Sequence, residues 1–201
     1  MTTYEEDIAD IYYNLQGYFT VMNIPFRPKE KREGGKGRGE IDLLAIKIND
    51  NKVLDAVHVE VGVSLTSAFP FVSKSRPKID ECNKIISKFF SNDSEYKIKE
   101  LIGNTDFRRV MITSSFAKNC LDKLKKRIPD FGGKILEISK EESDKINLKI
   151  EHNGKILKLE IVAFPRILKE TKRLFKEKGL EKKNFQDTRY RAIHYMIENN
   201  K

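Results

Sequence analysis

The chain has 201 residues, 34% of them charged, and 39 Lys and Arg against 30 Asp and Glu give a formal net charge of +9 at pH 7. This length allows one ordinary domain with a hydrophobic core, and the positive surface favours polyanions, so nucleic acid is the first partner to consider. Two distant cysteines, Cys82 and Cys120, argue against a disulfide framework or a zinc site. The acidic N-terminus and the lack of a long apolar run predict a cytoplasmic protein with no membrane contact.

The N-terminal part predicts one helix followed by three strands. Thr2 or Thr3 can cap a helix that ends at Gly17. A strand at 18–26 is followed by a glycine-rich basic loop at 27–39, which is too polar to pack. Two β-rich runs, at 40–48 and 53–63, are joined by the turn sequence NDNK and are expected to form a hairpin.

The middle of the chain alternates helices and strands. Residues 64–76 form a connection, and Pro77 is well placed to begin a helix whose inner side includes Ile79, Cys82, Ile85, Ile86 and Phe89. A shorter helix ends near Gly103, after which we expect a strand at 108–114, a helix at 117–128 and a strand at 133–139. This order predicts an α/β core on a mixed sheet that is flanked by helices.

The C-terminal part begins with a predicted β-hairpin. Two alternating runs, at 146–152 and 155–164, lie on either side of Asn153-Gly154, a strong hairpin signal. Two basic helices follow, at about 165–178 and 186–199. We therefore divide the chain into an α/β core at 1–139 and an extension at 140–201 that packs on it.

Acidic side chains fall on one face of the two central strands. Alternation places Glu40 and Asp42 together, and it places His58 with Glu60 on the face opposite to a row of valines. In a hairpin the acids would meet, with opposed Cβ atoms about 5 Å apart. Two adjacent carboxylates repel each other unless a cation joins them, and Mg²⁺ binds one or two carboxylates together with water and phosphate.

An ordinary structural role for Glu60 is the alternative. Glu60 would then face solvent on the open side of an antiparallel sheet and pair with a lysine such as Lys47. The functional interpretation is favoured by a conjunction: an acidic pair in GEID, an acidic strand beside it and a basic loop directly before it.

GEIDLLAI, a turn and then HVEVGVS resemble the PD-(D/E)xK nuclease superfamily, and the resemblance covers about the first 140 residues. It implies a restriction-endonuclease-like fold that binds Mg²⁺ or Mn²⁺. Carried over by position, Asp42 and Glu60 would bind the metal, and Glu40 would support them. Glu6, or less surely Glu5 or Asp7, would be the acid that the family places on its N-terminal helix.

The chain departs from the family pattern at Gly62, where the family has a lysine that holds the attacking water. Glycine cannot supply a fixed cation to stabilise developing charge. We expect another cation to take this role, and Lys78 is the first candidate, ahead of Lys74 and Arg76. His58 could bind metal or carry a proton, although a lone histidine in a strand is more often an ordinary hydrogen-bonded residue.

Two basic segments are candidates for phosphate contacts. The loop before the acids supplies one set, and the connection after them supplies two further residues. These residues are Arg27, Lys29, Lys31, Arg32, Lys36, Arg38, Lys74 and Arg76. The second segment, 166–191, has ten basic residues and four acids. Phosphate contacts carry little sequence information, so we expect weak sequence preference.

Three functions remain open from the sequence. The leading one is a metal-dependent nuclease that hydrolyses DNA in a homodimeric or monomeric form. The second is a nucleic-acid-binding module that lost catalysis with the lysine. The third is an interaction protein whose basic faces contact acidic partners.

Overall fold

The computed structural model of the chain describes residues 3–26, 39–62, 88–89, 91–113, 116, 120–129, 132–141, 143–180 and 190–191. The helices and strands among them are, in chain order, α1 (Tyr4–Leu15), β1 (Phe19–Phe26), β2 (Gly39–Asn49), β3 (Lys52–Gly62), α3 (Asn92–Ile102), β4 (Arg108–Thr113), α4 (Cys120–Arg127), β5 (Gly133–Glu141), β6 (Lys145–His152), β7 (Lys155–Ala163) and α5 (Phe164–Glu177).

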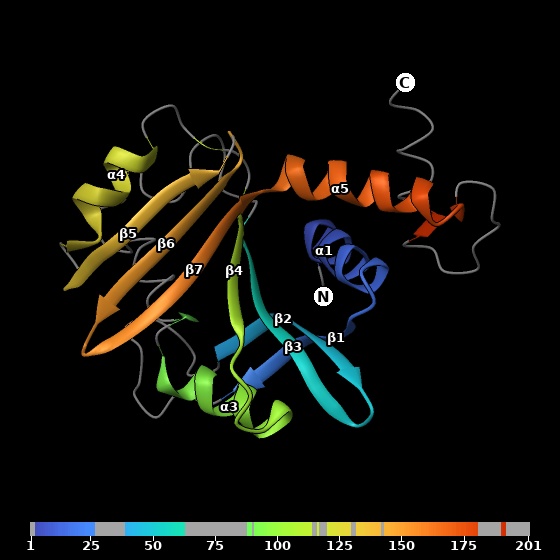
Figure 1. The fold of residues 1–201 in the computed structure, drawn as a ribbon, viewed down its shortest axis with the longest axis horizontal. Coiled ribbons are helices and arrows are strands. Elements are labelled where there is room, and N and C mark those ends of the chain that lie inside the picture. Colours follow the sequence, from blue (N-terminus) through green and yellow to red (C-terminus); the bar gives the residue numbers. More distant parts are fainter. Residues whose placement is uncertain are drawn as a thin grey trace.

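These strands form one mixed sheet of seven strands in the order β1-β2-β3-β4-β7-β6-β5 (Figure 1). β3 pairs with β4, and β4 with β7, in parallel, while the other neighbours are antiparallel. The predicted α/β class with a mixed sheet is therefore confirmed.

Both predicted hairpins are present, and each turns where the sequence allows an unusual backbone. The β2–β3 turn has positive φ at Asp50 (48°) and Asn51 (61°), and the β6–β7 turn has positive φ at Asn153 (49°) and Gly154 (74°). Positive φ at both central residues is what a two-residue turn with the twist of a hairpin requires. The β6–β7 register then runs unbroken from its turn, whereas the β2–β3 register shifts by one residue between Lys47 and Ile48, and this shift brings Asp42 and Glu60 to the same face.

Helices cover both faces of the sheet. On one face α1 and α5 pack side by side over the central strands, where Ile8, Ile167 and Phe175 join Val57 and Val59 in one buried cluster (Figure 1). On the other face α3 packs over β1–β3, and α4 packs over β5–β7. The row of valines in β3 therefore faces the core beneath α1, as its alternation predicts.

The C-terminal hairpin belongs to the same sheet as the N-terminal strands. β7 lies beside β4, and the boundary expected at 139/140 falls inside β5. α5 then returns across the sheet to pack on α1.

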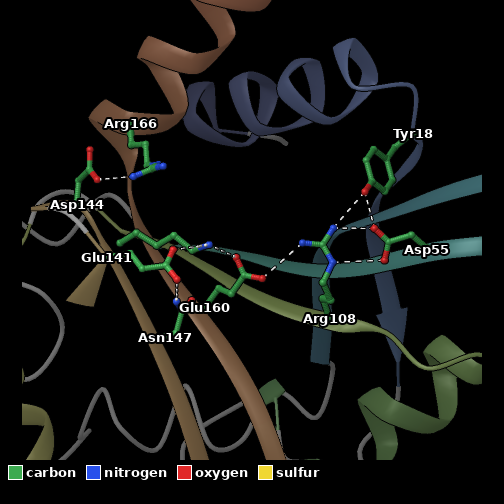
Figure 2. A network of polar contacts seen from close by, with 9 residues as sticks. Tyr18, Asp55, Arg108, Glu141, Asp144, Asn147, Glu160 and Arg166 are labelled. Carbon is green, nitrogen blue, oxygen red and sulfur yellow. Dashed lines mark hydrogen bonds and ion pairs between the residues drawn. The ribbon is translucent and has the colours of Figure 1, made fainter. Parts of the chain in front are cut away.

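A chain of polar contacts crosses the strands on the face that carries α1 and α5 (Figure 2). Arg108 in β4 binds Asp55 in β3 through Nη2 and Oδ2 at 2.7 Å, and the Tyr18 hydroxyl donates to the same carboxylate oxygen at 2.5 Å. On its other side Arg108 reaches Glu160 in β7 at 3.5 Å, and Glu160 accepts from Lys145 in β6 at 3.2 Å. These contacts join β3, β4, β7 and β6 in the order of the sheet.

We expect Phe175→Ala to lower the free energy of unfolding by about 3–5 kcal/mol, because it removes a fully buried aromatic ring and leaves a cavity between α5 and the sheet. Phe19→Ala is the matched control: Phe19 is 67% exposed, so the change should stay within about 0.5 kcal/mol. Urea unfolding of both variants measures the difference, and equal effects would contradict the packing of α5.

The Asp55→Asn variant should lose stability in a pH-dependent way. Partial burial acts to raise the pKa of Asp55, but hydrogen bonds from Arg108 and Tyr18 outweigh it and lower the pKa below its usual value. An acid with a lowered folded pKa contributes stability above its unfolded pKa of about 3.9 and loses that contribution as the pH falls through the folded pKa. The variant should thus be less stable at pH 7, by at most about 1 kcal/mol for a pair this exposed, with the difference shrinking as the pH falls below the unfolded pKa of about 3.9. A constant difference across this range would contradict this account.

Candidate active site

Asp42 and Glu60 lie on neighbouring antiparallel strands, as the hairpin prediction requires. Leu43 is paired with Val59, so the next position along the two strands brings Asp42 opposite Glu60. Both are buried, with exposed fractions of 9% for Asp42 and 1% for Glu60. The alternative in which Glu60 faces solvent and pairs with Lys47 is wrong, because Lys47 lies over the Tyr18 ring, 5.4 Å from its centroid.

Each carboxylate has one oxygen fixed by a neighbour and the other directed at a shared cation. The Val61 amide donates to Asp42 Oδ2 at 2.8 Å, and His58 Nε2 lies 2.7 Å from Glu60 Oε1. The remaining oxygens, Asp42 Oδ1 (3.0 Å) and Glu60 Oε2, both contact the ammonium of Lys88. A single positive charge is thus held between two buried acids.

Burial controls the proton affinities of the two acids. It raises the pKa of Asp42 to about 6, an effect that Glu60 adds to and Lys88 opposes. Burial also raises the pKa of Glu60, against the lowering effect of Lys88. For Lys88, burial acts to lower the pKa, but Glu60 and Asp42 outweigh it and raise the pKa. The three groups therefore favour an arrangement in which a cation remains between the carboxylates.

His58 serves to orient Glu60. It is 1% exposed, and its ring packs against Phe89 with centroids 4.9 Å apart. Burial, followed by the charges of Arg109 and Lys88, lowers its pKa to about 3, so the ring is neutral at pH 7. A neutral ring that contacts a carboxylate must donate from that nitrogen, so the proton is assigned to Nε2.

The backbone that carries Lys88 is fixed by two side chains from other elements. Ser94 in α3 donates to the Lys88 carbonyl at 2.7 Å. Arg109 in β4 donates to the Phe89 carbonyl at 3.2 Å, with its guanidinium 4.2 Å from the centroid of the Phe107 ring. Lys88 is therefore positioned by the fold, although its side chain keeps 31% of its exposure.

Lys88 is the residue that the sequence analysis missed. It precedes Phe89, the last inner residue of the predicted helix, and follows Ile85 by three positions, so it borders the apolar face. This position beside the apolar face was the only sequence signal that Lys88 could lie close to the sheet. Lys78, the expected substitute for the motif lysine, lies outside the described residues, as do Lys74, Arg76 and the loop residues Arg27, Lys29, Lys31, Arg32, Lys36 and Arg38.

Gly62 lies beneath the side chain of Met111. A Cβ atom at position 62 would stand 2.8 Å from Met111 Cε, closer than real Cβ atoms approach. Any larger residue at position 62 therefore requires Met111 to move. This methyl group is the end of a flexible side chain, so the required shift is small, and the cation that contacts the acids is supplied by Lys88.

The structure does not bring the other predicted acids to this pair. Glu6 forms a capping box with Thr3, in which its carboxylate accepts from the Thr3 amide at 2.9 Å. Its helix, α1, lies on the valine face, opposite to the Glu60 carboxylate. Glu40 follows Gly39 at the start of β2 and is exposed.

The donor set fits a hard divalent cation that retains water. Within the described residues no group of three or more His, Cys, Asp or Glu side chains is arranged to hold a metal ion. Mg²⁺ needs only one or two carboxylates, because it keeps several waters and binds substrate phosphate. Asp42 Oδ1 and Glu60 Oε2 already converge on one cation, so they are the oxygens that would bind it.

The described part of the second basic segment lies away from the acids. α5 packs on the valine face, and two of its arginines are paired: Arg166 with Asp144 at 2.8 Å, and Arg173 with Glu170 and Glu177. This helix therefore supplies charge to the face opposite to the acid pair.

Comparisons with protein-family models, with curated proteins and with solved structures find no match to this chain. In the part of the chain that the structure describes, none of the helices has the length and apolar character needed to cross a membrane.

Lys88→Met should destabilise the metal-free protein, because it leaves two buried carboxylates facing each other without a cation. Removing one partner of a buried ion pair costs about 3–5 kcal/mol, and the partial exposure of Lys88 should place the loss at or below this range. Adding Glu60→Gln to Lys88→Met should recover part of it, with a coupling of about 0.5–3 kcal/mol. Urea unfolding at pH 7 in EDTA measures both quantities.

The control for this cycle is Lys99→Met, which removes an exposed pair with Glu95 in α3. Such a pair contributes about 1 kcal/mol or less. A Lys88→Met variant as stable as Lys99→Met would contradict the structural importance of the Lys88 contacts.

Proposed function

We propose that the protein is a metal-dependent nuclease that hydrolyses phosphodiester bonds of DNA with little sequence specificity. The observation that carries this proposal is the convergence of Asp42 Oδ1 and Glu60 Oε2 on one cation in a buried site. The restriction-endonuclease-like fold is part of the proposal. It is supported by an antiparallel β2–β3 pair that holds the acids, followed by the parallel strand β4.

Asp42 and Glu60 would hold Mg²⁺ or Mn²⁺ in this site. When bound, such an ion polarises a phosphoryl oxygen and lowers the pKa of a coordinated water. The Val61 amide and His58 keep the two carboxylates in the orientation that binding requires, since each occupies the oxygen that is not directed at the cation.

Lys88 supplies the positive charge that Gly62 cannot. A phosphodiester carries a negative charge that is redistributed during attack, and a fixed ammonium stabilises that charge. The side chain is partly exposed, unlike the acids, so it can reach a phosphate that approaches from solvent. Lys88 thus replaces Lys78 as the proposed substitute for the motif lysine.

The reaction is hydrolysis by direct displacement. The oxygen of one water molecule forms a bond to phosphorus as the bond between phosphorus and one sugar oxygen breaks. The water releases a proton to solvent and the departing oxygen takes one up. The products are a phosphomonoester and an alcohol, and no oxidant or reductant is consumed.

A formal charge of +9 supports nucleic acid as the substrate class. Binding that rests on phosphate contacts releases counterions, so the affinity should fall steeply with salt. Contacts of this kind do not discriminate between bases, which supports weak sequence preference.

A second candidate is a nucleic-acid-binding module that does not cut. The specific observation in its favour is that Lys88 already occupies the place between both acids, while the Met111 methyl group lies over Gly62. In this case divalent ions would have no effect on stability or on DNA binding.

We expect the wild-type protein to cleave labelled duplex, single-stranded or branched DNA in Mg²⁺ or Mn²⁺ but not in EDTA. Asp42→Asn and Glu60→Gln should abolish cleavage, because each removes a carboxylate that would hold the metal. Lys88→Ala should slow it by about 100-fold or more, because it removes the ammonium that stabilises charge on the phosphate. Matched controls are Glu137→Gln, on the edge strand β5, and Lys99→Ala, on α3.

A second measurement does not depend on turnover. Mg²⁺ should raise the Tm of the wild type by mass action and leave the Tm of Glu60→Gln nearly unchanged. Salt-dependent DNA binding without cleavage or a Mg²⁺-dependent Tm would favour the second candidate, and failure to bind DNA would exclude both.

A further inference from the structure

One buried hydroxyl near the acid pair has no hydrogen-bond partner in the described part of the chain. Thr113 ends β4 and is fully buried, and its Oγ1 makes no hydrogen bond. Buried hydroxyls are normally paired, so an unpaired one calls for a specific explanation. Thr171 provides the ordinary case: it is also buried, and its hydroxyl donates to the Ile167 carbonyl at 2.7 Å.

The register places Thr113 beside the position of the missing lysine. In the parallel β3–β4 pair, Glu60 is aligned with Met111 and Gly62 with Thr113. Met111 packs with Phe89, and a Cβ on Gly62 would meet its methyl group, so Met111 lies on the same face as His58 and Glu60. Thr113 is two residues further along β4 and therefore shares this face.

The position is also where a doubly covered α/β sheet binds ligands. β3, β4 and β7 run in parallel and end at Gly62, Thr113 and Ala163, so their carboxyl ends meet at one edge. Ligands of open α/β sheets bind at this edge. Thr113 thus combines an unpaired donor and acceptor with a location beside the acids.

We propose that Thr113 is a positioning residue that holds the attacking water beside Glu60. In the resembling family this task belongs to the lysine that Gly62 replaces, and here it is divided between the Lys88 ammonium and the Thr113 hydroxyl. The inference rests on the proposed nuclease function and deepens it.

A water molecule suits this site better than a direct contact with substrate. Thr113 is fully buried, so a nucleic-acid backbone does not reach it, whereas a single water is small enough to take a place beside a buried hydroxyl once neighbouring side chains shift. Such a water needs two to four polar partners, and the threonine hydroxyl can donate one hydrogen bond and accept others. In the reaction this water supplies its oxygen to phosphorus and releases one proton to solvent.

The first arm of the experiment compares Thr113→Val with Thr171→Val in metal-free protein. Removing an unpaired hydroxyl while keeping its shape should leave the Tm unchanged or raise it. Removing the paired hydroxyl of Thr171 should lower the Tm by about 2–4 °C. A comparable fall in Thr113→Val that is accompanied by an unchanged kcat would show that its hydroxyl serves the fold alone, and would overturn the proposal.

The second arm measures DNA cleavage in Mg²⁺. Thr113→Val should lower kcat by about tenfold, the equivalent of one hydrogen bond to a reacting group, with little change in KM or in the Kd for DNA measured in EDTA. Thr113→Ser keeps the hydroxyl and should retain most of the activity, and Thr171→Val should keep the wild-type kcat.

The outcomes separate this inference from the proposed function. Active wild type with an equally active Thr113→Val overturns the role of Thr113 alone, as does a Thr113→Ser variant that is as impaired as Thr113→Val. Wild-type protein that binds DNA and never cuts it overturns both proposals together.

Discussion

The interaction on which the candidate site depends is the contact of one ammonium with two buried carboxylates. Asp42 and Glu60 are buried on one face of the sheet, and ionised acids in such a place need a cation. Lys88 provides it, and its backbone is fixed by Ser94 and Arg109. The site therefore requires both the correct position of Lys88 and the correct pairing of β2 with β3. If either fails, a buried charge is left without a partner.

The sheet separates structural from chemical work by face. The row of valines in β3 packs beneath α1 and α5, while alternate residues of the same strand present His58 and Glu60 to the other side. The antiparallel hairpin sets the acids side by side, and the parallel strand β4 brings Met111 and Thr113 next to them. The polar contacts that run from Tyr18 to Lys145 link neighbouring strands on the opposite face of the sheet. These more exposed charges are thus separated from the acid pair by the sheet itself.

Features that depend on residues close together in the chain could be predicted from the sequence, and features that depend on distant contacts could not. The β2–β3 hairpin was accessible because alternating runs and a short turn predict it, but Asp42 and Glu60 are opposed only because the register shifts by one residue between Lys47 and Ile48, which the sequence does not signal. The role of Lys88 could not be predicted. A lysine that borders the apolar face of an expected helix looks like any solvated lysine until its position relative to the sheet is known. Glu6 was expected beside Asp42 and Glu60. It instead caps α1, where its carboxylate accepts a hydrogen bond from the Thr3 amide. Met111 and Thr113 carry no sequence signal at all, since their relation to Gly62 exists only in the β3–β4 register.

The contact of Met111 with Gly62 links two positions that are 49 residues apart in the chain. A lysine at position 62 would require the methyl group of Met111 to shift, and it would then compete with Lys88 for the same pair of acids. In related chains we expect positions 62 and 88 to covary: either glycine at 62 with lysine at 88, or lysine at 62 with position 88 released. The location of the positive charge is thus a property of the two positions together, and replacing Lys88 by itself would leave the two acids without a balancing charge.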